Sequence, residues 1–180
     1  MQIIIVGCGN VGSTIVEKLS KEGHNITVID TKADAIKNIT INYDVMGMVG
    51  NGAGYSMQRD AGIEGADLMI AVTGSDELNL LCCLIAKKAG GCHTIARVRN
   101  PVYSREISFI KEELGLSMVI NPEDAAAMEI ARVLKFPSAI KIDTFAKGRI
   151  ELVKYRIEEG SFLCDKALKD VSAGTKCDVL

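Results

Sequence analysis

Aromatic residues and histidine are scarce in this chain. Its 180 residues include no tryptophan, four phenylalanines, four tyrosines and two histidines. Proteins that bind single-stranded nucleic acid stack the bases on aromatic rings, and this composition offers too few rings for such a platform. The net charge of −2 and the isoelectric point near 5.7 also argue against a surface for nucleic acid or anionic membranes.

A long apolar run is missing as well. The longest uncharged stretch near the middle, residues 78–86, includes Asn79 and is far shorter than the roughly 18–20 residues that cross a bilayer. Met1 leads directly into the apolar segment 2–6, without the basic region or cleavage site of a secretory signal. We therefore expect a cytoplasmic protein.

The cysteines do not form metal-binding or disulfide patterns. There is no C-x-x-C pair, and no histidine stands at metal-ligand spacing. Two of them lie in a leucine-rich helical segment, where cysteine is typically a small buried hydrophobic residue. We expect neither a metal site nor a disulfide among the six, which are Cys8, Cys82, Cys83, Cys92, Cys164 and Cys177.

Aliphatic runs alternate with helical patterns over residues 1–135. Runs without polar residues indicate strands covered on both faces, as in a parallel sheet. The runs stand at 3–6, 26–29, 45–49 (weakened by Gly47), 68–72, 94–98 and 118–120. Helical patterns start at Val11, cover 32–42, 55–61 and 76–88, start again at Pro101 and cover 121–134. We predict an α/β fold for domain 1–135, a Rossmann-type doubly wound parallel six-stranded sheet, because right-handed crossovers place helices on both faces.

The pattern changes after Phe136-Pro137. Alternating segments at 139–145 and 149–157, around Lys147-Gly148, predict a hairpin, and a loop with a short helix around 165–170 follows. Residues 136–180 are too few for an independent core. We predict a partial small α+β domain at 136–180 and expect the chain to be a piece of a longer protein.

The segment Gly7-Cys8-Gly9-Asn10-Val11-Gly12 carries the chemistry. Glycines at this spacing are weak evidence alone, but here a strand precedes them and a helix follows. Gly7 would form the tight turn, Gly9 would let backbone N–H groups approach a pyrophosphate, and Gly12 would let the helix pack on the strand. The start of the helix attracts the phosphates. A tight turn without ligand is the alternative.

Asp30 ends the second strand, 18 residues after Gly12. A carboxylate there accepts hydrogen bonds from ribose hydroxyls and repels a 2′-phosphate, which favours NAD over NADP. Lys32 lies close enough to weaken that preference. The alternative for Asp30 is a helix cap before Lys32.

Three further strand ends should surround the same crevice, because ligands bind outside the carboxyl ends of the strands. Arg97 could neutralise a phosphate, or it could form a salt bridge with an acid such as Glu123. Asp76 and Glu77 are better explained as helix-start residues. The three segments are Gly50-Asn51-Gly52, Val72-Thr73-Gly74-Ser75 and Arg97-Val98-Arg99.

Residues for catalysis are not evident. A dehydrogenase needs a proton donor or acceptor beside the nicotinamide. His24 and His93 precede strands, so they should lie at the amino ends, opposite the crevice. There is no Tyr-x-x-x-Lys pair, and no substrate domain follows. We therefore expect a ligand sensor rather than an enzyme.

The assembled motifs resemble the nucleotide-binding subunits of Trk/Ktr-type bacterial potassium uptake, the TrkA family with its RCK or KTN domains. Beyond about residue 137, the chain resembles the start of that family's C-terminal domain. The segments that carry the resemblance are MQIIIVGCGNVG (1–12), ITVID (26–30), VGNG (49–52), ADLMIAVTGSDELN (66–79), IARVR (95–99) and NPE (121–123).

The resemblance implies homodimers or rings at the inner face of the membrane, on a separate potassium-translocating subunit. It implies NAD(H) as ligand, or ATP/ADP. Cys8 stands where the family often has Ala, and Gly74 where Ser or Asn is common. The nucleotide contacts carried over from the motifs are Gly7, Cys8, Gly9, Asn10, Val11, Asp30, Asn51, Gly52, Thr73, Gly74 and Arg97, with Gly12 completing the turn.

We hypothesise that two ligand states, such as NADH and NAD or ATP and ADP, favour different dimer geometries and so gate the membrane subunit. A coupling of roughly 1–3 kcal/mol would alter gating several-fold. Three alternatives stay open: the same role with ATP/ADP, a small NAD-dependent oxidoreductase, and an oligomerisation module that binds no nucleotide.

Overall fold

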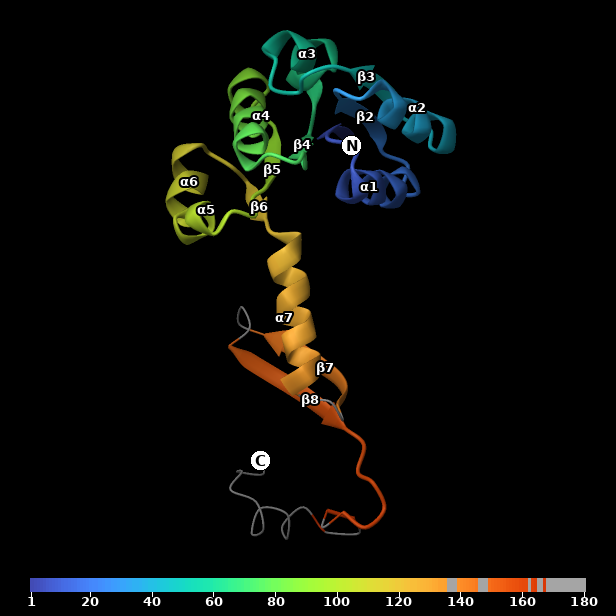
Figure 1. Cartoon of the computed structure of the whole chain (residues 1–180), viewed down its shortest axis with the longest axis vertical. Coiled ribbons are helices and arrows are strands. Elements are labelled where there is room, and N and C mark those ends of the chain that lie inside the picture. The colour runs from blue at the N-terminus through green and yellow to red at the C-terminus, as the bar shows by residue number, and fades with distance from the viewer. Residues whose placement is uncertain (136–138, 146–148, 162, 165–166, 168–180) are drawn as a thin grey trace. The chain divides into compact units, whose positions relative to one another are not determined.

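The computed structural model describes residues 1–135, 139–145, 149–161, 163–164 and 167. The chain divides into two compact units, residues 1–125 and 126–180 (Figure 1). The domain boundary predicted after residue 135 remains a prediction. The short helix predicted around 165–170 and the turn at Lys147-Gly148 fall outside the described residues.

A six-stranded parallel sheet forms the centre of the first unit, as predicted. The strand order is β3-β2-β1-β4-β5-β6. The chain starts in the middle with β1, moves outward to β3 and returns to β4 on the other side of β1. This reversal creates the switch point beside which open α/β sheets bind ligands. The strands are β1 (Gln2–Val6), β2 (Asn25–Asp30), β3 (Met46–Val49), β4 (Leu68–Ala71), β5 (His93–Arg97) and β6 (Met118–Ile120).

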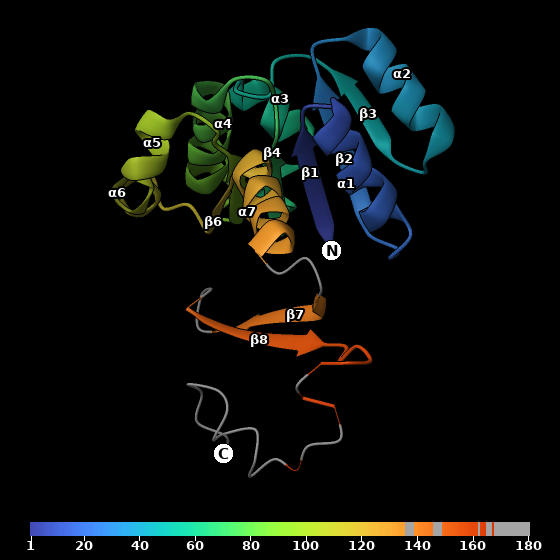
Figure 2. The ribbon, with the colours of Figure 1, turned by 60° about the horizontal axis from the view of Figure 1, so that its bottom comes forward.

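Helices cover both faces of this sheet (Figures 1 and 2). On one face, Ile3 and Ile5 pack with residues of α1 and α2. On the other, Ile4 and Val6 pack with residues of α3, η1 and α4. Successive strand residues point to opposite faces, so the unbroken run at 3–6 supplies both cores. The helices are α1 (Asn10–Ser20), α2 (Ala33–Asn42), α3 (Tyr55–Asp60), the 3₁₀ turn η1 (Ile63–Gly65), α4 (Asp76–Ala89), α5 (Pro101–Arg105), α6 (Ile107–Glu113) and α7 (Pro122–Lys135).

Gly47 in the third strand leaves space for a neighbouring helix. A Cβ at Gly47 would lie 2.6 Å from Ile36 Cγ2 and 2.7 Å from Thr40 Cγ2, both on α2. The glycine therefore weakens β3 as a strand but allows α2 to pack closely against it.

The single helix predicted from Pro101 is instead two helices, α5 and α6. Glu106 joins them with φ −105° and ψ 13°, outside the helical region. Tyr103 of α5 and Ile107 of α6 both pack against the core below α4. Because residues four apart share one face of a helix, this packing alone does not account for the break. The 3₁₀ turn η1 is a further element that the sequence patterns did not predict.

The second unit contains the predicted hairpin, coloured orange in Figure 1. Strands β7 (Ala139–Phe145) and β8 (Ile150–Tyr155) are antiparallel, with an irregularity of register between Ala139 and Lys141. Lys135, at the end of α7, forms an ion pair with Glu151 of β8 (2.8 Å). No helix in the described part of the chain is long and apolar enough to cross a membrane.

Candidate functional site

A cavity of about 650 Å³ opens at the carboxyl ends of the parallel strands. The strand order explains its place, because the segments after β1 and β4 diverge there to opposite faces of the sheet. It collects eleven of the twelve residues singled out from the sequence: Gly7, Cys8, Gly9, Asn10, Val11, Asp30, Asn51, Gly52, Thr73, Gly74 and Arg97.

Gly12 is the predicted residue that does not line the cavity. A Cβ there would lie 1.8 Å from the Gly7 carbonyl oxygen, so this position serves the packing of α1 on the turn. Gly7 has φ 101°, which strains any other residue, and its Cβ would lie 2.9 Å from the Thr73 nitrogen. Gly9 is different, because nothing lies within 4 Å of an added Cβ.

The start of α1 faces the cavity without a side-chain cap. Gly9 is the N-cap residue and offers no acceptor, and the first turn contains no acidic residue. The first amides of a helix have no partner within it, and the helix dipole makes this end positive. The segment Gly9-Asn10-Val11 therefore presents backbone donors suited to an anion.

Asp30 holds the glycine turn in place as well as lining the cavity. Its Oδ2 accepts the backbone N–H of Cys8 (2.7 Å), and its Oδ1 accepts the N–H of Lys32 (2.9 Å). The second contact fixes the backbone just before α2, but the N-cap residue of that helix is Lys32, so Asp30 is not its cap. Each carboxylate oxygen accepts more than one hydrogen bond, so the group retains capacity for a ligand hydroxyl.

The Cys8 thiol is half-buried beside this carboxylate. Burial, together with the nearby charge of Asp30, raises the pKa of the thiol to about 12. The neutral thiol therefore predominates at neutral pH, and Cys8 acts as a small lining residue rather than a nucleophile.

Asn79 builds the rim on the other side of the cavity. Its side chain is fully buried in α4. The Oδ1 atom accepts the Thr73 backbone N–H (2.8 Å) and the Thr73 hydroxyl (2.7 Å), while Nδ2 donates to the Arg97 carbonyl (2.9 Å). One side chain thus fixes the segments that follow β4 and end β5.

Asp76 reinforces the same rim. Its Oδ2 accepts the backbone N–H groups of Arg99 (2.8 Å) and Asn100 (2.7 Å). The Arg99 guanidinium in turn donates to the Gly74 carbonyl (2.6 Å). Asp76 lies in the first turn of α4 and does not line the cavity, in agreement with its interpretation as a helix-start residue.

Sequence reasoning missed Asn79 as a site-building residue, although a signal was present. The buried residues of α4 are Asp76, Asn79, Cys82, Cys83 and Ala86, at the spacing of one helix face. A polar residue on that face needs partners inside the protein. The lining also includes Thr31, Ala35 and Leu78, which follow or open elements at the same sheet edge.

The segment after β3 closes the remaining side. A Cβ at Gly52 would lie 2.3 Å from Val6 Cγ1, so only glycine lets this backbone cross the end of β1. The buried Gln58 of α3 donates to the Gly52 carbonyl (2.7 Å) and the Cys82 carbonyl (3.0 Å). Asn51 holds its own turn by accepting the Ala53 N–H (3.0 Å).

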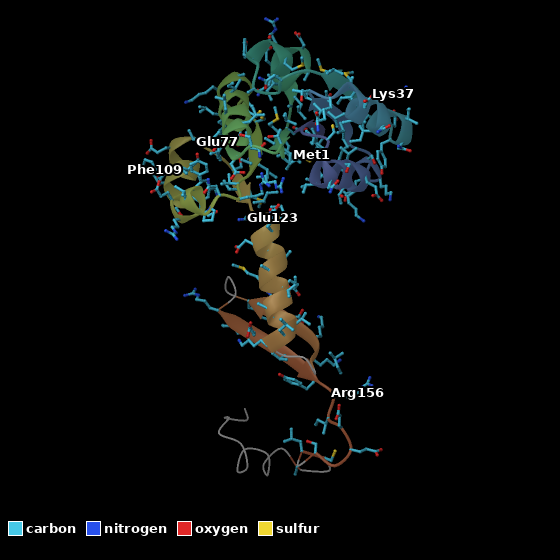
Figure 3. All side chains as sticks on the ribbon, viewed as in Figure 1. Met1, Lys37, Glu77, Phe109, Glu123 and Arg156 are labelled. Atoms are coloured by element: carbon cyan, nitrogen blue, oxygen red, sulfur yellow. The ribbon has the colours of Figure 1, made fainter. Side chains whose placement is uncertain are left out.

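Arg97 lines the cavity and also forms the ion pair considered from the sequence. Its Nη2 donates to Glu123 Oε1, in the first turn of α7. Figure 3 labels Glu123 at this end of α7. Burial acts to raise the pKa of Glu123, but hydrogen bonds from Arg97 and from its own backbone N–H, with the positive charges of Arg97 and Arg99, hold that pKa below its usual value.

Neither histidine lines this cavity. His24 borders a separate pocket of about 430 Å³ with Ser20, Asn25 and Asp44, at the amino ends of the strands. His93 begins β5, and its Nδ1 pairs with the Ser117 hydroxyl (3.1 Å). Among the described residues, no group of three or more potential ligands is arranged to hold a metal ion.

The strand order, the glycine turn and the acid at the end of β2 define this unit as a Rossmann-type domain. The comparison with known families is more specific. The chain belongs to the TrkA-N domain family, whose model matches residues 3–122.

Curated relatives are named as TrkA proteins of potassium uptake. A Trk system potassium uptake protein TrkA homolog of Archaeoglobus fulgidus is 37% identical over 171 residues, which cover 95% of this chain and 39% of that protein. The TrkA protein of Haemophilus influenzae is 36% identical, over 93% of this chain and 37% of its own length. The chain thus spans less than half the length of these relatives.

Solved structures share the fold. The TrkA-N domain of the Escherichia coli inner membrane protein ybaL has a TM-score of 0.66 at 25% identity, over 74% of this chain and 96% of that domain. An AMP-bound Kef C-terminal domain of Shewanella denitrificans scores 0.63 at 19% identity, over 78% and 84%. The GsuK channel bound to NAD scores 0.57 at 20% identity, over 79% and 24%. The latter two likenesses show the fold alone.

Proposed function

We propose that this chain is the nucleotide-sensing part of a potassium uptake regulator and that its ligand is NAD(H). The observation that carries the proposal is the cavity itself, which brings eleven residues from five separate segments to one sheet edge. The family supports the potassium system, because the curated relatives are named Trk system potassium uptake proteins.

The residues present fit such a ligand. The open space at Gly9 and the uncapped start of α1 suit a diphosphate. Asp30, fixed by Cys8 and Lys32, would accept a ribose hydroxyl. Arg97 adds positive charge on the far side of the turn. The cavity volume falls within the range of about 300–1,000 Å³ that is usual for small-molecule sites.

A regulatory role follows from the way the ligand would act. The lining segments end or follow five strands and begin α1, α2 and α4, so a ligand there contacts many elements of the first unit. Two ligand states that contact these segments differently would favour different arrangements of a homodimer or ring. The membrane partner would be a Trk/Ktr-type potassium-translocating subunit, with this domain on its cytoplasmic side.

ATP or ADP is the second candidate ligand. A carboxylate that binds ribose serves either nucleotide, and the Kef domain of the same fold was solved with AMP. We favour a regulator over an oxidoreductase because no histidine lines the cavity and both histidines lie at other positions of the described chain.

Isothermal calorimetry with NADH, NAD, NADPH, ATP and ADP tests the ligand. We expect NADH or NAD to bind most tightly and NADPH to bind at least tenfold more weakly, because Asp30 repels the 2′-phosphate. The role is tested by potassium flux into proteoliposomes that contain a Trk-type membrane subunit and a full-length regulator with this domain. A flux that ignores NADH and NAD, or steady hydride transfer by the chain, would overturn the proposal.

A further inference from the structure

Arg97 both lines the cavity and forms an ion pair with Glu123. Its side chain is only 12% exposed, and one of its nitrogens bonds Glu123. Its Nε is buried and has no hydrogen-bond partner. A buried guanidinium N–H without an acceptor is unfavourable, so the ion pair with Glu123 leaves Arg97 incompletely satisfied.

Glu123, the partner of Arg97, is more exposed to solvent than Arg97 itself. The Glu123 side chain is 54% exposed, so water competes for its carboxylate. Phosphate oxygens are strong acceptors for arginine and can bind two guanidinium nitrogens at once. A phosphate that reached both Nε and Nη2 would satisfy the guanidinium more fully than Glu123, which accepts from Nη2 alone.

The strand order says which part of a nucleotide reaches Arg97. Asp30 lies on β2, the glycine turn follows β1, and the next strands are β4 and then β5, which ends in Arg97. Neighbouring strands are roughly 4.8 Å apart, so Arg97 stands about two spacings beyond the turn. A ribose at Asp30 and a first phosphate at the turn leave Arg97 to whatever follows the first phosphate.

We propose, on the basis of the nucleotide site above, that Arg97 exchanges Glu123 for the second phosphate of the ligand. Nucleotides with a diphosphate, such as NAD and ADP, complete this exchange, whereas a monophosphate such as AMP leaves the ion pair intact. Arg97 and Glu123 together therefore determine the length of phosphate chain that the cavity favours.

The exchange also makes a contact of α7 depend on whether a diphosphate ligand is bound in the cavity. Glu123 lies in the first turn of α7, which runs on to Lys135. When Arg97 leaves, the first turn loses its ion pair with the end of β5. A diphosphate ligand thus changes the contact between the sheet and the helix that leads out of the first unit, and AMP does not.

Calorimetry on the wild type and E123Q with AMP, ADP and NAD tests the exchange. The E123Q variant removes the competitor for Arg97, so ADP and NAD should bind about threefold more tightly, the scale of an exposed ion pair, while AMP affinity stays unchanged. The matched control is D124N, which removes the neighbouring exposed carboxylate in the same turn and should alter none of the three affinities.

The double variant R97Q/E123Q isolates the role of the arginine. In the R97Q background, E123Q should no longer affect ADP or NAD. Equal tightening of all three ligands by E123Q, or tightening that persists without Arg97, would overturn the exchange while leaving the nucleotide site intact. If the R97Q variant does not fold, the titrations of the wild type and E123Q with the three ligands are sufficient to test the exchange. A wild type that binds none of the three overturns the proposed function itself.

Discussion

The three glycines at the turn between β1 and α1, Gly7, Gly9 and Gly12, differ in physical role. Gly7 is required by its backbone conformation, with φ 101°. Gly12 is required by close packing on the Gly7 carbonyl, and Gly9 has open space before it. The motif predicted the turn at Gly7 and the packing at Gly12, because both depend on local geometry that the strand-turn-helix arrangement imposes. The approach of a pyrophosphate at Gly9 stays a prediction.

The variants G12A and G9A should separate folding from binding. In G12A the new methyl group meets the Gly7 carbonyl oxygen at 1.8 Å, so the free energy of unfolding should fall by about 3 kcal/mol. In G9A nothing is displaced, and the loss should stay below about 1 kcal/mol, the cost of a poorer N-cap.

Urea denaturation followed by circular dichroism measures the first effect, and calorimetry with NADH the second. G9A should bind NADH at least tenfold more weakly, because its methyl group occupies the approach of the diphosphate to α1. A G9A protein with full affinity would show that the ligand does not lie over this turn.

Between the elements, the rim of the cavity depends on buried polar side chains. Asn79 of α4 connects Thr73, after β4, to the carbonyl of Arg97, at the end of β5. Asp76 binds the following segment through the backbone of Arg99 and Asn100. The helix thereby sets the positions of two cavity segments that it does not itself form.

Replacing Asn79 by alanine should therefore damage both stability and binding. The change leaves the Thr73 N–H and the Arg97 carbonyl without their side-chain partner, while the Thr73 hydroxyl is left to donate only to the Ser75 carbonyl, and this should cost about 3 kcal/mol. Differential scanning calorimetry and NADH titration should show both losses. The exposed Asn38 of α2 provides the control, and N38A should change stability by less than about 0.5 kcal/mol. A stable N79A protein with intact affinity would refute this role.

Most of the elements could be predicted, since strands buried on both faces produce uninterrupted aliphatic runs. The division into α5 and α6 could not, because nothing around Glu106 resembles a helix stop. The break is a matter of the backbone at Glu106, which leaves the helical region. Eleven cavity residues were predicted because strand ends meet at one edge. Asn79 and Gln58 were not, because their partners are backbone carbonyls and N–H groups distant in sequence.

At the scale of the whole molecule, the described chain consists of a unit built on a six-stranded parallel sheet and a second unit with a hairpin. It covers 39% and 37% of the length of the two TrkA relatives described above. The helix α7 begins in the first unit, where Glu123 of its first turn pairs with Arg97, and runs on into the second.

A crystal structure of the chain grown with NADH tests the central claim most directly. We expect the diphosphate over the amides of Gly9-Asn10-Val11, a ribose hydroxyl within hydrogen-bond distance of Asp30, and Arg97 turned from Glu123 to the second phosphate. NADH bound elsewhere while this cavity stays empty, or density for a ligand of another chemical class in it, would contradict the account.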